Sequence, residues 1–319
     1  MKAIVNDRFG SPELQDVERP EVAEDTVLVR VHASSVNAAD WYAMMGRPYV
    51  SRLMGVGFRR PKNRILGTDY AGRVEAVGSG VTQFKPGDEL FGARTGSYAE
   101  YVTVAADRHA LKPANLSFEE AAAVPVAGLT ALQALRDKGG LQPGQHVLIN
   151  GASGGVGTHA VQIAKALGAE VTGVCRTRNV ELVRSLGADH VVDYEREDFT
   201  KSERRYDLMI DIAGSRPFPK CRRVLTPGAT IVVVGGSKNR LLGPLYHVLR
   251  MRLRSIGKSQ KVVFFISKVD RDDMVFLREL IEAGKLRPFI DRTYPLAEIR
   301  DALRHFDVEH ARGKIVITV

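Results

Sequence analysis

A glycine-rich turn is the feature of this sequence whose residue types point most directly to chemistry. Residues 151–157 read Gly-Ala-Ser-Gly-Gly-Val-Gly, and the spacing Ala152-x-Gly154-x-x-Gly157 matches a dinucleotide fingerprint whose first glycine is replaced by alanine. Residues without a Cβ let backbone N–H groups approach a pyrophosphate closely, and a helix N-terminus adds unpaired N–H groups and a positive dipole end. The turn therefore predicts cofactor contacts from Ser153, Gly154, Gly155, Val156 and Gly157.

The residues after the next strand indicate which dinucleotide is bound. An NAD site usually places an acidic residue there, but this chain has Cys175-Arg176-Thr177-Arg178-Asn179 and no carboxylate before Glu181. Arginine binds phosphate through a planar fork of N–H donors. We therefore predict NADPH (NADP+) rather than NADH, with Cys175, Arg176 and Arg178 at the adenosine end. The alternative is a solvated basic turn.

The flanking segments supply the strand–turn–helix–strand unit that such a site requires. Residues 146–150 predict a buried strand, and apolar residues at helical spacing follow from Val156 to Leu167. Gly168 stands where a helix C-terminal cap is expected, and residues 170–174 predict a second strand. This context distinguishes the turn from a chance glycine pattern.

The rest of the chain changes pattern twice. Residues 1–123 predict short strands separated by turn signals, typical of a small barrel or partly open sheet. Residues 124–266 contain six candidate strands alternating with helices, which predict a doubly wound parallel sheet. Residues 267–319 predict two helices and a closing strand that returns to the first domain. The six candidate strands are 147–149, 171–174, 191–192, 208–212, 231–234 and 262–266.

Composition narrows the class of protein. The chain has 319 residues, of which 44% are hydrophobic, and a formal net charge of +9. We see no secretory signal and no apolar run long enough to span a membrane. Two cysteines cannot form a disulfide framework, so a cytoplasmic location is expected. The basic charge lacks a nucleic-acid motif, so we expect no nucleic-acid partner.

Several further motifs together resemble those of the medium-chain dehydrogenase/reductase family, in its zinc-free quinone oxidoreductase branch. The resemblance covers nearly the whole chain. It implies an α/β fold in which a Rossmann domain interrupts a GroES-like catalytic domain, and usually a homodimer. The motifs are Asn37-x-x-Asp40-x-Tyr42, Leu66-Gly67-Thr68-Asp69-x-x-Gly72, Val77-Gly78-x-Gly80-Val81, Lys85-Pro86-Gly87-Asp88, Gly96-x-Tyr98-Ala99-Glu100, Gly128-Leu129-Thr130-Ala131, Leu186-Gly187-Ala188-Asp189 and Gly313-Lys314-Ile315-Val316.

The same resemblance lets the metal sites of the zinc branch be checked. Asn37 stands where that branch has a catalytic cysteine, and Thr68 and Asp69 stand where it has His-Glu. Its structural zinc lobe needs four cysteines, and this chain has two. Asparagine and threonine oxygens are poor zinc ligands. We therefore expect no zinc, and a hydride transfer without a metal Lewis acid.

The resemblance also assigns site residues. We expect Tyr42, Asn37 and Thr130 to be catalytic, with Tyr42 donating a hydrogen bond or proton to the substrate oxygen. The alternatives are a packed tyrosine, a turn-capping asparagine and an ordinary helix residue, and Asp40 is expected to hold loop structure. Further cofactor contacts are expected from Tyr194, Phe264, Phe265 and Lys314, although a lysine before a last strand is usually solvated. His305 and His310 are expected at the surface.

Two basic stretches, residues 47–64 and 240–261, stand out. The second is amphipathic, with Leu245, Leu249, Leu253 and Ile256 on one side and several arginines and lysines beside them. Basic amphipathic helices can lie on anionic membranes, so weak peripheral membrane contact is one hypothesis. A helix packed on the protein with a solvated basic face is the alternative.

These observations favour a zinc-independent, NADPH-dependent reductase. Quinones and α,β-unsaturated carbonyls suit a metal-free hydride transfer, because conjugation spreads the incoming charge. Two alternatives stay open. One is a 2-alkenal or enone double-bond reductase without quinone activity, and the other is a non-catalytic NADPH-binding sensor.

Overall fold

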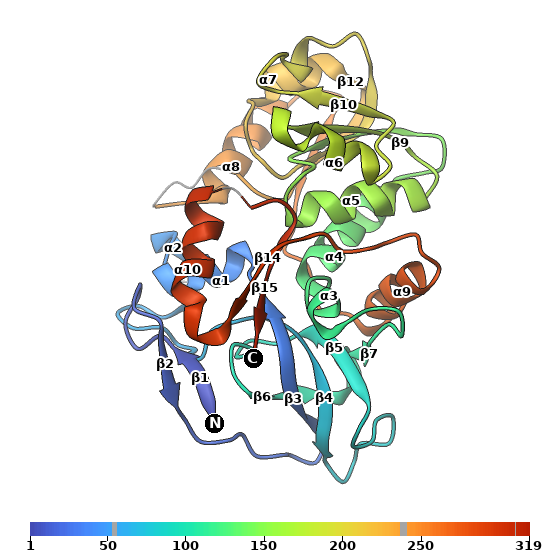
Figure 1. Ribbon diagram of the computed structural model, residues 1–319. Helices are drawn as coiled ribbons and strands as arrows, with labels where there is room; N and C mark the ends of the chain where they lie inside the picture. Colours follow the sequence, from blue (N-terminus) through green and yellow to red (C-terminus); the bar gives the residue numbers. More distant parts are fainter. Residues whose placement is uncertain (53–55, 237–240, 310) are drawn as a thin grey trace. The chain divides into compact units, whose positions relative to one another are not determined.

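The computed structural model describes residues 1–52, 56–236, 241–309 and 311–319 (Figure 1). The chain divides into unit 1, Met1–Leu129 with Lys268–Val319, and unit 2, Thr130–Ser267. Unit 2 is therefore an insertion in the sequence of unit 1. Residues 124–129, which we placed in the nucleotide-binding domain, lie in unit 1, and residue 267 lies in unit 2.

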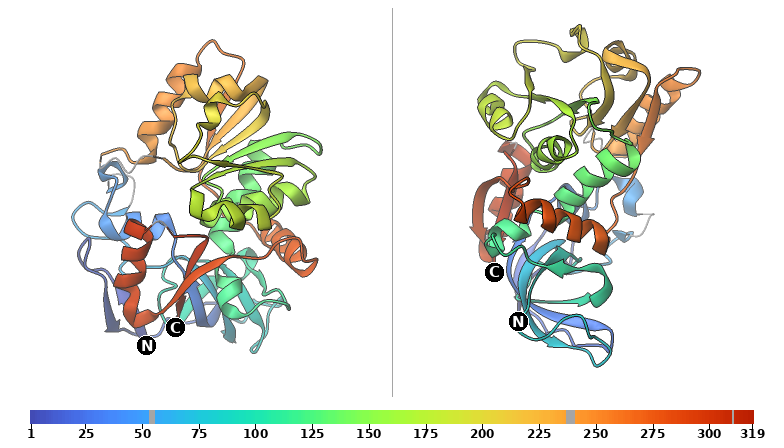
Figure 2. Two further views of the ribbon diagram at one scale, coloured as in Figure 1. Left: turned by 45° about the horizontal axis from the view of Figure 1, so that its top comes forward. Right: turned by 90° about the vertical axis from the view of Figure 1, so that its right-hand side faces the viewer.

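Unit 2 is built on a six-stranded parallel sheet in the order β10-β9-β8-β11-β12-β13. Its strands are runs of Val, Ile and Leu, as expected where helices cover both faces of a sheet (Figure 2). The six strands predicted from the sequence are confirmed. They are β8 His146–Asn150, β9 Glu170–Cys175, β10 His190–Asp193, β11 Tyr206–Asp211, β12 Leu225–Val233 and β13 Lys261–Phe264.

The helices of unit 2 follow their strands closely in the sequence. The predicted helix at 180–186 is α6, and the amphipathic stretch within 240–261 contains α8. The helices are α5 Gly155–Ala166, α6 Val180–Ser185, α7 Phe218–Cys221 and α8 Pro244–Ser255, with a π-helix η3 Gln133–Lys138 and short 3₁₀ turns η4 Thr177–Asn179, η5 Phe199–Lys201 and η6 Arg222–Val224. The core of unit 2 includes Leu148, Met209, Phe218, Ile231 and Met251.

Unit 1 contains a sheet in the order β14-β15-β3-β4-β5-β7, with β6 also paired to β3. The last strand, β15, pairs antiparallel with β3 and parallel with β14, so the returning C-terminal segment shares a sheet with β3, whereas the first two strands form a separate two-stranded sheet. The strands are β1 Lys2–Val5, β2 Glu13–Asp16, β3 Thr26–Ser35, β4 Asp69–Val77, β5 Glu89–Ala93, β6 Tyr101–Ala105, β7 Ala110–Leu111, β14 Ile290–Pro295 and β15 Lys314–Thr318.

The helices of unit 1 are short, apart from α9 in the returning segment. None of the described helices combines the length and the apolar composition that crossing a bilayer requires. The helices of unit 1 are α1 Ala38–Met45, α2 Tyr49–Ser51, α3 Phe118–Ala122, α4 Pro125–Leu132 (which runs into unit 2), α9 Arg271–Glu282 and α10 Ile299–Arg304, with 3₁₀ turns η2 Ala106–Arg108 and η7 Leu296–Glu298 and a π-helix η8 His305–Glu309.

The expectation of a surface histidine at 305 was wrong. His305 is buried, its Nε2 lies 3.1 Å from Asp291 Oδ2, and its Nδ1 lies 3.0 Å from the hydroxyl of Tyr294. The carboxylate and the phenol satisfy both ring nitrogens, which makes burial of the imidazole possible. His310, and Leu53, Met54 and Arg240 of the basic stretches, lie outside the described residues.

Candidate functional site

The glycine turn joins the end of β8 to the start of α5. Gly151 has φ +99°, a left-handed conformation that favours glycine, so it makes the tight turn. Ala152 is fully buried, and its N–H donates to the carbonyl of Val174 at 3.0 Å. The role of the first fingerprint glycine therefore falls to Gly151, one residue before the alanine that we aligned with it.

The two glycines of the fingerprint, Gly154 and Gly157, have different structural roles. A Cβ on Gly157 would stand 2.1 Å from the carbonyl oxygen of Gly151, so this glycine permits close helix–strand packing. A Cβ on Gly154 would meet nothing closer than 3.8 Å, which leaves open space beside the backbone. The first bond of the helix runs from the N–H of Thr158 to the carbonyl of Gly154, so the N–H groups of residues 155–157 precede it. This cradle fits a pyrophosphate.

The ends of β9 and β10 lie next to the turn, since β10, β9 and β8 are neighbours in the sheet. The Nε of Arg176 donates to the hydroxyl of Tyr194 at 3.0 Å. Asn179, directly after Arg178, donates from Nδ2 to Ser153 Oγ at 2.9 Å. The structure thus brings the predicted residues Ser153, Arg176, Arg178 and Tyr194 to one edge of the sheet.

Sequence reasoning missed Glu195 at this edge. Its Oε1 lies 3.2 Å from Arg176 Nε, and its Oε2 accepts the N–H of Thr177 at 3.2 Å. We searched for an acid only along the chain after β9, whereas this one follows β10. The strand order expected for a doubly wound sheet was the signal that could have revealed it.

The side chain of Cys175 does not reach this edge. It is 2% exposed, and burial, reinforced by Asp193, raises the pKa of its thiol to about 11. Its carbonyl accepts the N–H of Tyr194 at 3.0 Å. As the last residue of β9 it points into the core, so its assignment as a cofactor contact is corrected to a core residue that supports Tyr194.

Three more predicted residues lie where the chain enters and leaves unit 2. Phe264 ends β13 and packs against the core of this unit, and Phe265, like Phe264, is half-buried. The hydroxyl of Thr130 donates to Ser267 Oγ at 2.9 Å. This bond joins the first and last residues of unit 2. Thr130 belongs to unit 2, whereas Asn37 and Tyr42 belong to unit 1.

In unit 1, Asn37, Asp69 and Lys314 form a buried cluster. Lys314 Nζ donates to Asn37 Oδ1 at 2.5 Å, to the carbonyl of Val36 at 3.0 Å and to Asp69 Oδ2 at 3.2 Å. Asp69 Oδ2 also accepts from Asn37 Nδ2 at 2.9 Å and from Ser35 Oγ at 2.7 Å. Asp69 Oδ1 takes the N–H of Val126 at 2.9 Å.

This cluster bears on two predictions. Lys314 is buried rather than solvated, and its three N–H donors already have three acceptors, so it has none left for a cofactor phosphate. Asn37 is also buried, with its carbonyl on Lys314 and its amide on Asp69. Its described contacts are those of a structural residue at the start of α1, so the catalytic role expected of it stays a prediction.

Asp40 extends the cluster into the first turn of α1. Its carboxylate accepts from Thr68 Oγ1 at 2.6 Å, from the N–H of Asn37 at 2.9 Å and from the hydroxyl of Tyr98 at 3.4 Å. Burial, opposed by these hydrogen bonds and reinforced by Asp69, raises the pKa of Asp40 to about 6. Its contacts agree with the expectation that it holds loop structure.

Tyr42 lies two residues further along α1. It is half-buried, and its ring meets that of Trp41 edge-on, with centroids 5.2 Å apart. Burial, reinforced by Asp307, raises the pKa of Tyr42, so its hydroxyl keeps its proton at neutral pH. Within the described residues its hydroxyl makes no hydrogen bond, which leaves the donor available. In the part of the chain that the structure describes, no group of three or more His, Cys, Asp and Glu side chains could hold a metal ion.

Two family models match this chain. Residues 23–114 match the family model described as alcohol dehydrogenase GroES-like domain, and residues 186–317 match the model described as zinc-binding dehydrogenase. The protein of Mus musculus named NAD(P)H oxidoreductase RTN4IP1, mitochondrial, is 34% identical over 355 residues, covering 100% of this chain and 89% of that protein.

Two further proteins are similar over the same length. The 2-methylene-furan-3-one reductase of Solanum lycopersicum is 32% identical over 335 residues, covering 99% of this chain and 79% of that protein. The structure of the quinone oxidoreductase from Coxiella burnetii superposes with a TM-score of 0.87 at 30% identity, covering 100% of this chain and 99% of that one.

The glycine turn yields a paired prediction. Gly157→Ala should lower the free energy of unfolding by about 1–3 kcal/mol, because its Cβ overlaps backbone. Gly154→Ala should change it by no more than about 0.5 kcal/mol, yet weaken NADPH binding about tenfold or more by filling the open space. Denaturant unfolding and calorimetric titration of both variants measure this. Unchanged NADPH affinity in Gly154→Ala would contradict the cradle.

The buried carboxylate yields a pH prediction. Because the pKa of Asp40 is raised to about 6 in the folded protein, above its ordinary value of 3.8, the folded protein binds the proton more tightly, and stability falls as pH rises from about 4 to 6. Asp40→Asn stays neutral, so its free energy of unfolding should gain about 2.4 kcal/mol on that of the wild type between pH 4 and pH 7. Parallel urea titrations across this range test it, and coincident pH profiles would refute it.

Proposed function

We propose that this chain, which belongs to the medium-chain dehydrogenase/reductase superfamily in its quinone oxidoreductase-like branch, is an NADPH-dependent reductase of quinones or α,β-unsaturated carbonyls. The observation that carries the proposal is the glycine cradle at residues 151–157, with open space at Gly154 and N–H groups ahead of the first helical bond. The names of similar proteins, an NAD(P)H oxidoreductase, an enone reductase and a quinone oxidoreductase, support the same reaction class.

We further propose that the reaction uses no zinc. One matching family model is described as zinc-binding, yet the positions of the zinc branch's catalytic ligands are occupied here by Asn37, Thr68 and Asp69. Asn37 and Asp69 are already bonded to the Lys314 ammonium, and Thr68 donates to Asp40. A second cation beside a buried ammonium would be repelled. Metal analysis of the purified protein tests this proposal.

The chemistry asked of the protein is then modest. NADPH would supply a hydride to an electron-poor carbon, and the chain's own task is to meet the negative charge that develops on the substrate oxygen. Tyr42 suits this task, because its hydroxyl is protonated and has no partner among the described residues. It would donate a hydrogen bond or the proton that completes the two-electron reduction.

The preference for NADPH over NADH rests on Arg176 and Arg178. Both follow β9, where the ribose of the adenosine is expected. Arg176 is also paired with Glu195, which reduces the net positive charge offered to a 2′-phosphate. We therefore propose a preference for NADPH that is real but not absolute.

Two expectations remain part of the proposal. A homodimer follows from the family resemblance. A cytoplasmic location follows from the cysteine content, whereas the mouse relative is named mitochondrial. Two alternatives stay open. One is an enone reductase without quinone activity, and the tomato relative is named a 2-methylene-furan-3-one reductase. The other is an NADPH-binding protein without turnover, and the assay below distinguishes both from the proposed function.

The substrate class is tested by loss of NADPH absorbance with 1,4-benzoquinone, a 2-alkenal, an alkyl enone and a saturated aldehyde. We expect turnover of conjugated substrates and none of the saturated aldehyde. Tyr42→Phe should lower kcat about 10- to 100-fold, since one donor to the developing charge is lost, with NADPH affinity unchanged. Tyr101→Phe, at a tyrosine of β6 that contacts Arg19, is the matched control. Tight NADPH binding without any turnover would instead favour the sensor.

Cofactor choice is tested at both members of the ion pair. Arg176→Ala together with Arg178→Ala should weaken NADPH binding about 10- to 100-fold through loss of charged hydrogen bonds, and NADH binding by less than about threefold. Glu195→Gln should instead raise the affinity for NADPH relative to the affinity for NADH. Equal losses for both nucleotides in the double variant would remove the arginines from the phosphate site.

A further inference from the structure

Helix α8 carries an apolar stripe on its solvent side. Leu249 and Leu253, one helical turn apart, are 51% and 67% exposed, and Ile256, directly after the helix, is 73% exposed. On the other side Val248 and Met251 are buried in the core of unit 2. The helix is therefore anchored by one face and presents large apolar side chains on the other, an arrangement that marks an interaction surface.

Basic side chains flank this stripe in the sequence, and the segment that contains α8 has no acidic residue. Arg250, Arg252, Arg254 and Lys258 are exposed, and none of them forms an ion pair with any carboxylate that the structure describes. The sequence contains no Asp or Glu between Asp211 and Asp270, although this segment is rich in Lys and Arg. A surface so uniformly positive is complementary to an anionic partner.

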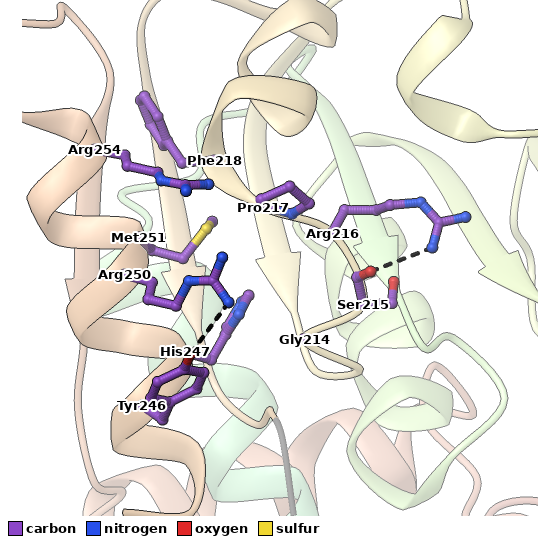
Figure 3. A pocket seen from close by; sticks show the side chains of 10 residues that line it. All are labelled: Gly214, Ser215, Arg216, Pro217, Phe218, Tyr246, His247, Arg250, Met251 and Arg254. Carbon is purple, nitrogen blue, oxygen red and sulfur yellow. Dashed lines mark hydrogen bonds between the residues drawn. The ribbon is translucent and has the colours of Figure 1, made fainter. Parts of the chain in front are cut away.

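A pocket of about 260 Å³ lies between α8 and residues 214–218 (Figure 3). Arg250 and Arg254, one helical turn apart, extend into it from α8, and Phe218 and Met251 give it an apolar wall. The Nε of Arg216 lies 3.4 Å from Asp198 Oδ1, so this arginine forms an ion pair. The positive charge available in the pocket therefore comes from the arginines of α8. Two guanidinium groups beside an apolar wall suit a phosphate attached to an apolar body.

We propose that α8 docks on an anionic phospholipid surface. Leu249, Leu253 and Ile256 enter the boundary between headgroups and acyl chains, and Arg250 and Arg254 hold a headgroup phosphate in the pocket. A second copy of the chain is the competing occupant of an exposed apolar face. A two-fold contact through α8 would set the same arginines against one another, which disfavours it. The proposal does not depend on the proposed reaction.

The test is co-sedimentation of the full chain with vesicles of phosphatidylcholine alone and with one third phosphatidylglycerol, at low and at physiological salt. We expect binding only to the anionic vesicles, weakened by salt. Arg250→Gln with Arg254→Gln should lower the partition coefficient about 25-fold, at about fivefold for each basic residue. Leu249→Ser with Leu253→Ser should abolish binding without unfolding the protein, because both side chains are exposed.

The matched control removes two positive charges from the opposite edge of the same sheet. Lys138→Gln with Lys201→Gln alters exposed lysines that precede β8 and β11, whereas the pocket follows β11. This variant should bind as the wild type does. An equal loss of vesicle binding in the control would mean that net charge alone explains the effect, and it would overturn the proposal. It would also be overturned by a lack of binding to anionic vesicles, or by a leucine variant whose only change is a smaller oligomer in sedimentation velocity.

Discussion

The ion pair of Lys314 with Asp69 is the interaction on which unit 1 depends. Both side chains are almost wholly excluded from water, at 3% and 0% exposure, so their desolvation is costly and must be offset by complete hydrogen bonding. That condition is met, since the ammonium has three acceptors and the carboxylate four donors. The partners come from the start of β15, the end of β3, the start of β4 and the start of α4. One buried charge pair thus joins the returning C-terminal segment to the N-terminal half of the unit.

The same cluster fixes the element that carries the proposed proton donor. Helix α1 has only eight residues, too few to be stable without tertiary contacts. Asn37 precedes it and bonds to Lys314 and Asp69, while Asp40 in its first turn bonds to Thr68 and Tyr98. Tyr42 follows on the next turn of a helix whose start is therefore rigidly held. A network at the positions of the zinc branch's ligands thus holds the start of α1 in place, and in the proposed reaction the proton donor is the neutral hydroxyl of Tyr42.

The sequence predicted what is local and missed what depends on pairing between distant segments. The strands of unit 2 and the glycine turn follow from short apolar runs and from residues that lack a Cβ, so they were found. Lys314 was misjudged because its partners Asn37 and Asp69 lie 277 and 245 residues away, and a lysine before a last strand is ordinarily solvated. Glu195 was missed because it reaches Arg176 across neighbouring strands. The fingerprint spacing placed the tight turn at residue 152, whereas the structure has the positive φ at Gly151. Spacing alone does not distinguish these two positions.

Exposure decides which basic residue can meet a cofactor phosphate. The side chains of Arg176 and Glu195 are 38% and 42% exposed, and ion pairs of that kind contribute only about 0–1 kcal/mol. In the proposed NADPH site, a 2′-phosphate would therefore replace Glu195 as the partner of Arg176 at little cost, and the released carboxylate would remain solvated. Redirecting Lys314 would strand the buried carboxylate of Asp69, at a cost of about 3–5 kcal/mol. That cost exceeds the stabilisation that one charged hydrogen bond to phosphate provides, about 1.5–3 kcal/mol. The half-exposed arginine can discriminate between cofactors, while the buried lysine is committed to the fold.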